Sequence, residues 1–88
     1  MKHEVVENKI LILQDELDIY DAPTLKEKIA EVAASHDSSV ILDLHQVKGV
    51  STPVIQIWMS ARKSLKDFTI VKIHEGVREN CSLFGYTL

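Results

Sequence analysis

Short, mainly apolar runs alternate with amphipathic stretches along this chain. An apolar pair at Val5-Val6, a turn signal at Glu7-Asn8 and the run Ile10–Leu13 predict an opening hairpin. Because Ile10–Leu13 contains no polar position, we expect its strand to lie in the centre of a sheet with both faces covered. The runs Val40–Leu44 and Phe68–Ile73 predict two further internal strands.

Between these predicted strands, apolar residues recur at the spacing of a helix. Apolar residues recur at helical spacing over Ala22–Ser35, and Asp21 is a candidate N-terminal cap for this first helix. A second long helix is predicted over about Pro53–Leu65. The spacing over Val77–Phe84 predicts a short last helix, which Gly85 can end.

The order of these elements predicts the fold class. Strands and helices alternate with short loops, which is typical of an α/β layer whose helices pack on a mainly parallel sheet through right-handed crossovers. Residues Tyr86–Leu88 favour a final edge strand. We therefore expect one α/β domain over residues 1–88.

Composition narrows the functional class. The 88 residues suffice for one small domain, and 45% hydrophobic against 26% charged residues indicates a folded chain. The formal charge of -3 is the wrong sign for a phosphate backbone, so we expect no nucleic acid partner. No apolar run approaches the roughly 20 residues that cross a bilayer, and Cys81 is the single cysteine. We expect a cytoplasmic protein without direct membrane insertion.

Few residues are spaced for catalysis or metal binding. The chain has four histidines, all in separate loops or strand ends: His3, His36, His45 and His74. None has the spacing of a metal ligand pair, and no glycine-rich phosphate loop is present, so we expect neither a metal nor a cofactor. Asp43, His45 and Ser51 raise the idea of a nucleophilic triad, but Asp43 lies within a strand and the nucleophile elbow is absent. We therefore expect no enzymatic activity.

The segment Val50–Pro53 is the most informative one. Ser51 and Thr52 precede a predicted helix, where a hydroxyl can cap unsatisfied N–H groups at the positive end of the helix dipole. A phosphate added there would meet the same donors and change the surface charge. Simple capping and capping with a phosphorylation switch both remain open on these residues.

Taken in order, these motifs resemble a STAS domain, the family named for sulfate transporters and anti-sigma factor antagonists. Glu16–Asp18 with Ala22–Lys26 is similar to the family's lead-in to its first helix, and Val40–Leu44 resembles its buried strand. Val50–Val54 falls where the family commonly has D-S-[ST]-G-[LV] before its second helix. The resemblance covers nearly the whole chain and implies a small mixed sheet with helices packed on one side and no catalytic centre.

The resemblance also implies a function. In the antagonist branch, the unphosphorylated protein binds an anti-sigma factor that is also a serine kinase, and phosphorylation of the first hydroxyl breaks the complex. Ser51 matches that phosphoacceptor, with Thr52 as the alternative. Val50 and Pro53 stand where the family usually has Asp and Gly. A constitutive, non-phosphorylated subunit of an ABC transporter, a chemotaxis pathway or a stress-signalling scaffold is therefore the alternative.

We expect the partner to contact the loop before the second long helix and one flank of that helix, beside Trp58, where an exposed apolar patch can extend. The expected contact residues are Gln46, Val47, Lys48, Gly49, Val50, Ser51, Thr52, Ile55 and Met59.

Overall fold

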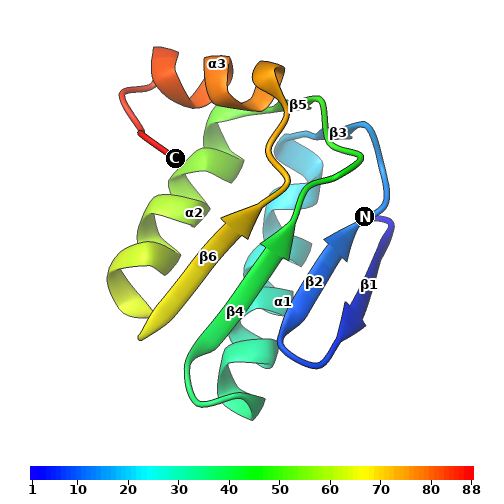
Figure 1. Cartoon of the computed structure of the whole chain (residues 1–88), viewed down its shortest axis with the longest axis vertical. Coiled ribbons are helices and arrows are strands. Elements are labelled where there is room, and N and C mark those ends of the chain that lie inside the picture. Colours follow the sequence, from blue (N-terminus) through cyan, green and yellow to red (C-terminus); the bar gives the residue numbers. More distant parts are fainter.

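Two long helices cover one face of a four-stranded sheet, and a short third helix closes one end of the domain (Figure 1). The computed structural model describes residues 1–88. The elements follow in this order along the chain: β1 (His3–Val6), β2 (Lys9–Ile12), β3 (Glu16–Leu17), the 3-10 turn η1 (Ile19–Asp21), α1 (Ala22–Ser35), β4 (Ser39–Asp43), β5 (Gly49–Val50), α2 (Thr52–Ser64), β6 (Asp67–Val71) and α3 (Glu75–Leu83). None of these helices combines the length and the apolar character needed to cross a membrane.

The sheet is mixed and mainly parallel, as the sequence predicts. Its strand order is β1-β2-β4-β6. The hairpin β1-β2 is antiparallel, and β2-β4 and β4-β6 are both parallel pairs. Parallel neighbours require a crossover, and α1 and α2 supply the two crossovers. This arrangement confirms the predicted α/β class.

The prediction that Ile10–Leu13 is covered on both faces is wrong. The strand is central, and Ile10 and Ile12 are fully buried beneath the helices, but Leu11 and Leu13 are only partly buried. Both crossovers have the same hand and the strand order progresses in one direction, so both helices lie on the same face. The opposite face of the sheet is left without a covering layer.

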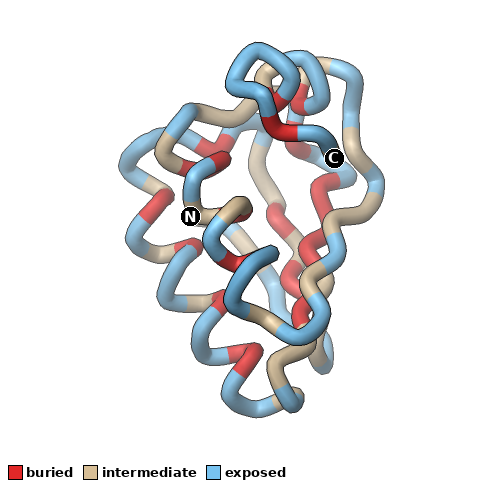
Figure 2. Tube along the Cα trace, turned by 90° about the vertical axis from the view of Figure 1, so that its left-hand side faces the viewer, coloured by how far each residue is buried: buried red, intermediate tan, exposed pale blue.

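The core lies between the sheet and the helices. Buried residues recur on the inward side of the chain, where α1, α2 and the sheet meet (Figure 2). Leu42 of β4 and Trp58 of α2 are both fully buried. Val77 and Cys81 anchor α3 in the same core. Cys81, the single cysteine, is fully buried there.

The helix ends differ from the predictions in detail. Asp21 makes no side-chain cap for α1; instead, Asp18 caps the preceding turn, and its carboxylate accepts from the N–H groups of Tyr20 and Asp21. Gly85 follows α3 with φ of 85°, a left-handed conformation that suits glycine. The predicted final strand at Tyr86–Leu88 is absent, because Tyr86 turns back and is buried against the core.

Candidate functional site

A second, two-stranded sheet places two helix beginnings next to each other. β3 and β5 are parallel, with Glu16 opposite Gly49 and Leu17 opposite Val50. The N–H of Ser51 donates to the carbonyl of Leu17 at 3.0 Å, which extends the pairing. The chain then enters η1 and α1 after β3, and α2 after β5. The sequence pattern did not predict this pair, since two-residue strands have no periodicity to detect.

Ser51 is the N-cap residue of α2, but its side chain does not cap the helix. Its carbonyl accepts from the N–H groups of Val54 and Ile55, while Oγ is shielded from solvent and has no hydrogen-bond partner. A capping hydroxyl accepts from the second or third N–H of the helix. The second residue is Pro53, which has no N–H, and the N–H of Val54, the third, is already bonded. The expected cap is therefore not formed.

Thr52 differs from Ser51 in exposure. It is the first residue of α2, and its side chain is exposed to solvent. The two adjacent hydroxyls thus occupy opposite environments, one shielded and one accessible.

Helix α3 contacts the loop before Ser51 at Lys48 and Val50. The side-chain oxygen of Asn80 accepts a hydrogen bond from the N–H of Val50 at 3.1 Å. Gly76 lies so close to the loop that a Cβ at this position would overlap the carbonyl oxygen of Lys48. These two contacts fix the loop on a rigid base. The sequence pattern missed both, because neither residue has a spacing that points to the loop.

The expected partner-contact residues differ in their exposure. Gln46, Lys48 and Thr52 are exposed, and Gly49, Val50, Ser51 and Met59 are partly exposed. Val47 and Ile55, also expected as contacts, are core residues with 0% and 2% exposure, so they present almost no surface to a partner. Val47 is turned inward, and Ile55 lies on the same inward helix face as Trp58. The patch expected from Ile55 and Met59 is therefore reduced to the partly exposed Met59.

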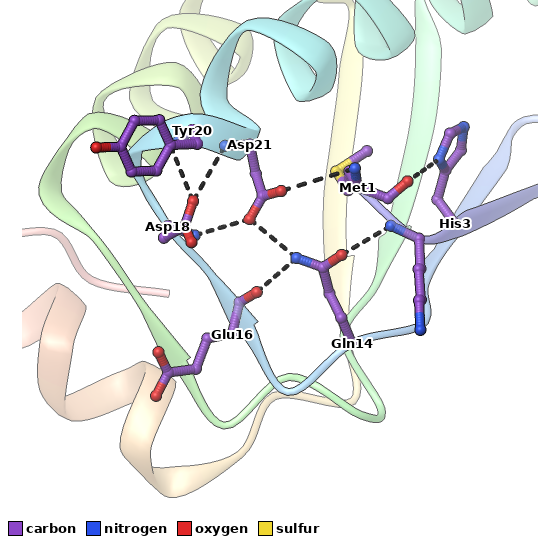
Figure 3. Close-up of polar contacts among 8 residues, drawn as sticks. Met1, His3, Gln14, Glu16, Asp18, Tyr20 and Asp21 are labelled. Carbon is purple, nitrogen blue, oxygen red and sulfur yellow. Dashed lines mark hydrogen bonds and ion pairs between the residues drawn. The ribbon is translucent and has the colours of Figure 1, made fainter.

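An exposed apolar pair lies at the same end of the domain. Ile19 and Tyr20 in η1 are 56% and 87% exposed. The carboxylates of Asp18 and Asp21 bond the backbone N–H groups of this turn, and Gln14 donates to Asp21 at 2.9 Å, leaving the ring of Tyr20 on the outside (Figure 3). The periodicity of the sequence did not indicate this pair. Two large apolar residues directly after a capping aspartate are the pattern that marks it.

The structure does not assemble the triad that the sequence raised. Oδ1 of Asp43 accepts from both the backbone N–H and Nδ1 of His45, each at 3.0 Å. Burial by itself raises the pKa of Asp43, but these hydrogen bonds and the charge of Lys72 outweigh it and hold that pKa below its ordinary value. The hydroxyl of Ser51 has no bond to His45, so the nucleophile is missing.

The side chains that could bind a metal ion do not gather at one place. No group of three or more His, Cys, Asp or Glu side chains is placed to hold a metal ion. Burial raises the pKa of the Cys81 thiol, which disfavours the reactive thiolate. The exposed residues at the α2 end of the domain are the polar residues Gln46, Lys48 and Thr52 and the apolar pair Ile19-Tyr20.

Comparisons with known proteins identify the family and the fold of the chain. The sequence pattern of the STAS domain matches residues 2–87. The fold is similar to that of an anti-sigma factor antagonist from Mycobacterium paratuberculosis, with a TM-score of 0.72 and 22% identity over 96% of this chain and 75% of the other. It is equally similar to a candidate anti-sigma factor antagonist from Thermotoga maritima, with a TM-score of 0.72 and 18% identity over 96% of this chain and 77% of the other. At these identities the likeness shows the fold. Among curated proteins, no sequence matches the chain.

Proposed function

We propose that this chain, which belongs to the STAS domain family, is a non-enzymatic regulatory module that binds a protein partner. The kind of partner that we propose is an anti-sigma factor with serine-kinase activity, because two solved structures of the same fold are described as anti-sigma factor antagonists. The observation that carries the proposal is the surface at the α2 end of the domain. There, exposed polar residues of the 46–52 loop lie at the same end as the exposed pair Ile19-Tyr20.

This end surface has the mixed chemistry of a protein interface. Tyrosine supplies a large contact area and loses little conformational entropy when it is ordered. Tyr20 is 87% exposed, on a turn whose backbone N–H groups donate to the carboxylates of Asp18 and Asp21. Gln46 and Lys48 add polar groups on a loop that α3 supports. Preorganised segments lower the ordering cost of association.

We further propose that phosphorylation of a hydroxyl regulates this surface. Ser51 is the first candidate, because its Oγ is not committed to a cap or to any other hydrogen bond. Its modification requires the side chain to rotate toward solvent, since Oγ is shielded. Thr52 is the alternative acceptor and is already exposed. A phosphate on either residue adds a charge of about −1.5 to −2 to the contact surface.

A constitutive STAS subunit is the second candidate function. The shielded Oγ of Ser51 favours it, together with Pro53, which removes one of the N–H donors that would hold a phosphate. In that case the complex with a transporter or scaffold component forms regardless of kinase activity. The two candidates therefore differ in one measurable property, the effect of ATP on the complex.

The test is a native pull-down with wild-type protein, Ser51→Asp and Thr52→Asp, with and without ATP, followed by mass spectrometry. Ser35→Asp is the matched control, because it adds the same charge at the far end of α1 on an exposed residue. Recovery of a serine kinase by wild type and Ser35→Asp, with loss in one acceptor variant and a phosphate mapped to the same residue, supports the switch. Equal recovery of a transporter or scaffold component by all four proteins contradicts the switch and supports the constitutive subunit.

A further inference from the structure

An elongated groove runs between α1 and α2 on the helical side of the domain. It has a volume of about 800 Å³, and its lining follows α2 from Pro53 to Leu65. At 1.5 Å per residue this is a length of about 18–20 Å. One end of the groove opens at Ile19, which belongs to the exposed turn at the proposed contact surface. The groove is thus continuous with that surface.

The groove is open along its length and has a packed apolar floor. Ala22, Ile29 and Ala61 line it and are nearly buried. The remaining lining includes small or polar residues that are exposed, among them Ala30 and Ser60. A small ligand usually buries 70–90% of its surface or more in its pocket, which an open groove does not provide. An amphipathic helix buries only its apolar face in a groove and keeps its polar face in water, so an open groove is sufficient for it.

The charge of the groove lining favours one kind of bound helix over others. Lys26 is the only charged residue in the lining, and it forms no ion pair within the chain. No Asp or Glu lines the groove, although the chain as a whole has a net charge of -3. An acidic side chain on the occupant is therefore complementary to this site.

We propose that the α1-α2 groove binds an amphipathic helix of the protein partner. Large apolar residues of that helix, spaced at i, i+3 or i+4, and i+7, lie on the floor formed by Ala22, Ile29 and Ala61. The small side chains of Ala30 and Ser60 allow its backbone to approach closely. An acidic residue on its flank pairs with Lys26. The inference rests on the proposed function only in that the partner is a protein.

The test is selection from a displayed library of helical peptides of about sixteen residues, which is about four turns. Apolar positions vary among Leu, Ile, Phe, Met and Ala, and flanking positions vary among Glu, Lys and Gln. The bait is the full chain, and the variant Ala30→Arg fills the groove with an exposed side chain. Ala34→Arg is the matched control, because it makes the same change one turn further along α1, on an exposed residue outside the lining.

We expect wild type and Ala34→Arg to enrich peptides with large apolar residues and Glu flanks, and Ala30→Arg to bind them about tenfold or more weakly. Lys26→Glu should reverse the flank preference from Glu to Lys. Amide shifts in the NMR spectrum of the chain should map to α1 and α2. Urea unfolding of each variant shows whether it is folded, so that weaker peptide binding can be assigned to the groove and not to loss of the fold.

Each of the following results overturns the groove inference. The proposed function is tested separately, by the pull-down. No enrichment above the Ala30→Arg background excludes a helix as the occupant. Peptide-induced shifts confined to residues 46–52 place the binding on the loop. Concentration-dependent dimerisation, or saturable shifts at the groove with dodecanoate but with no peptide, assigns the groove to a second copy or to an anionic amphiphile. If groove peptides bind and the pull-down recovers no partner, the groove inference stands and the proposed function fails.

Discussion

Replacing Gly76 with alanine tests whether α3 holds the contact loop in place. Gly76 lies in the first turn of α3. On helix propensity alone, alanine at a helical position is more favourable than glycine by up to about 1 kcal/mol. A Cβ at this position, however, would overlap the carbonyl oxygen of Lys48, which is backbone and cannot rotate away. Propensity and tertiary contact therefore predict effects of opposite sign.

The steric effect should be the larger one. Overpacking at a well-packed contact costs typically 1–3 kcal/mol, so we expect a net loss of about 1–2 kcal/mol in the free energy of unfolding after propensity is subtracted. Gly49→Ala is the comparison. Its Cβ would have no neighbour nearer than 3.6 Å, the side-chain oxygen of Asn80, which is an ordinary contact. We expect that variant to lose less stability than Gly76→Ala.

Urea unfolding followed by tryptophan fluorescence measures both variants. Trp58 is the single tryptophan and is fully buried, so its emission reports loss of the core. Equal slopes with urea would show that the compactness of the two end states is unchanged and that the midpoints report stability. NMR shifts of the Lys48 and Thr52 amides would report movement of the loop.

A Gly76→Ala variant as stable as wild type, or more stable, would refute this reasoning. Propensity would then outweigh the contact, and α3 could not be the rigid base of the loop. A variant that is destabilised while the loop amides keep their shifts would show that α3 moves instead of the loop.

Three further predictions follow from burial and charge. Leu42→Ala should lower the free energy of unfolding by about 2–5 kcal/mol because its side chain is fully buried in a central strand, whereas Ile41→Ala, on the open face, should cost less in the same urea titration. The pKa of Asp43 is lowered in the fold, so its ionised form stabilises the fold above about pH 4 and this contribution is lost on further acidification; Asp43→Asn should make stability fall less steeply with acid, and an identical acid limb would contradict this. Cys81 is buried with a raised pKa, so its thiol should react with Ellman's reagent far more slowly in the native protein than in urea, and equal rates would mean that α3 is not docked.

Secondary structure followed closely from local pattern. Helix α1 spans Ala22–Ser35, the predicted range, because its apolar stripe is complete and Pro23 suits a first turn. The hairpin of β1 and β2 is where the apolar pairs and the Glu7-Asn8 turn predict it. Short-range periodicity is sufficient for such elements, since each one buries a continuous face.

The candidate site was predictable only in part. The segment around Ser51 was predicted correctly as the beginning of α2, and Gln46, Lys48 and Thr52 are exposed there, while their role as partner contacts stays a prediction. The inward orientation of Ile55 was not foreseen, because a sequence pattern does not state which flank of a helix the sheet will cover. Tyr20 was missed for a related reason: its exposure depends on the turn that Asp18 stabilises.

The sequence by itself determined the fold class, the order of strands and helices, and the place of two hydroxyls at the beginning of a helix. These properties depend on residues close together in the chain. Only the tertiary structure decided that the Ser51 hydroxyl is shielded and unbonded, and that Asn80 and Gly76 contact a loop that precedes them by about thirty residues. These properties arise from long-range packing, in which side chains distant in sequence compete for the same space and the same hydrogen bonds.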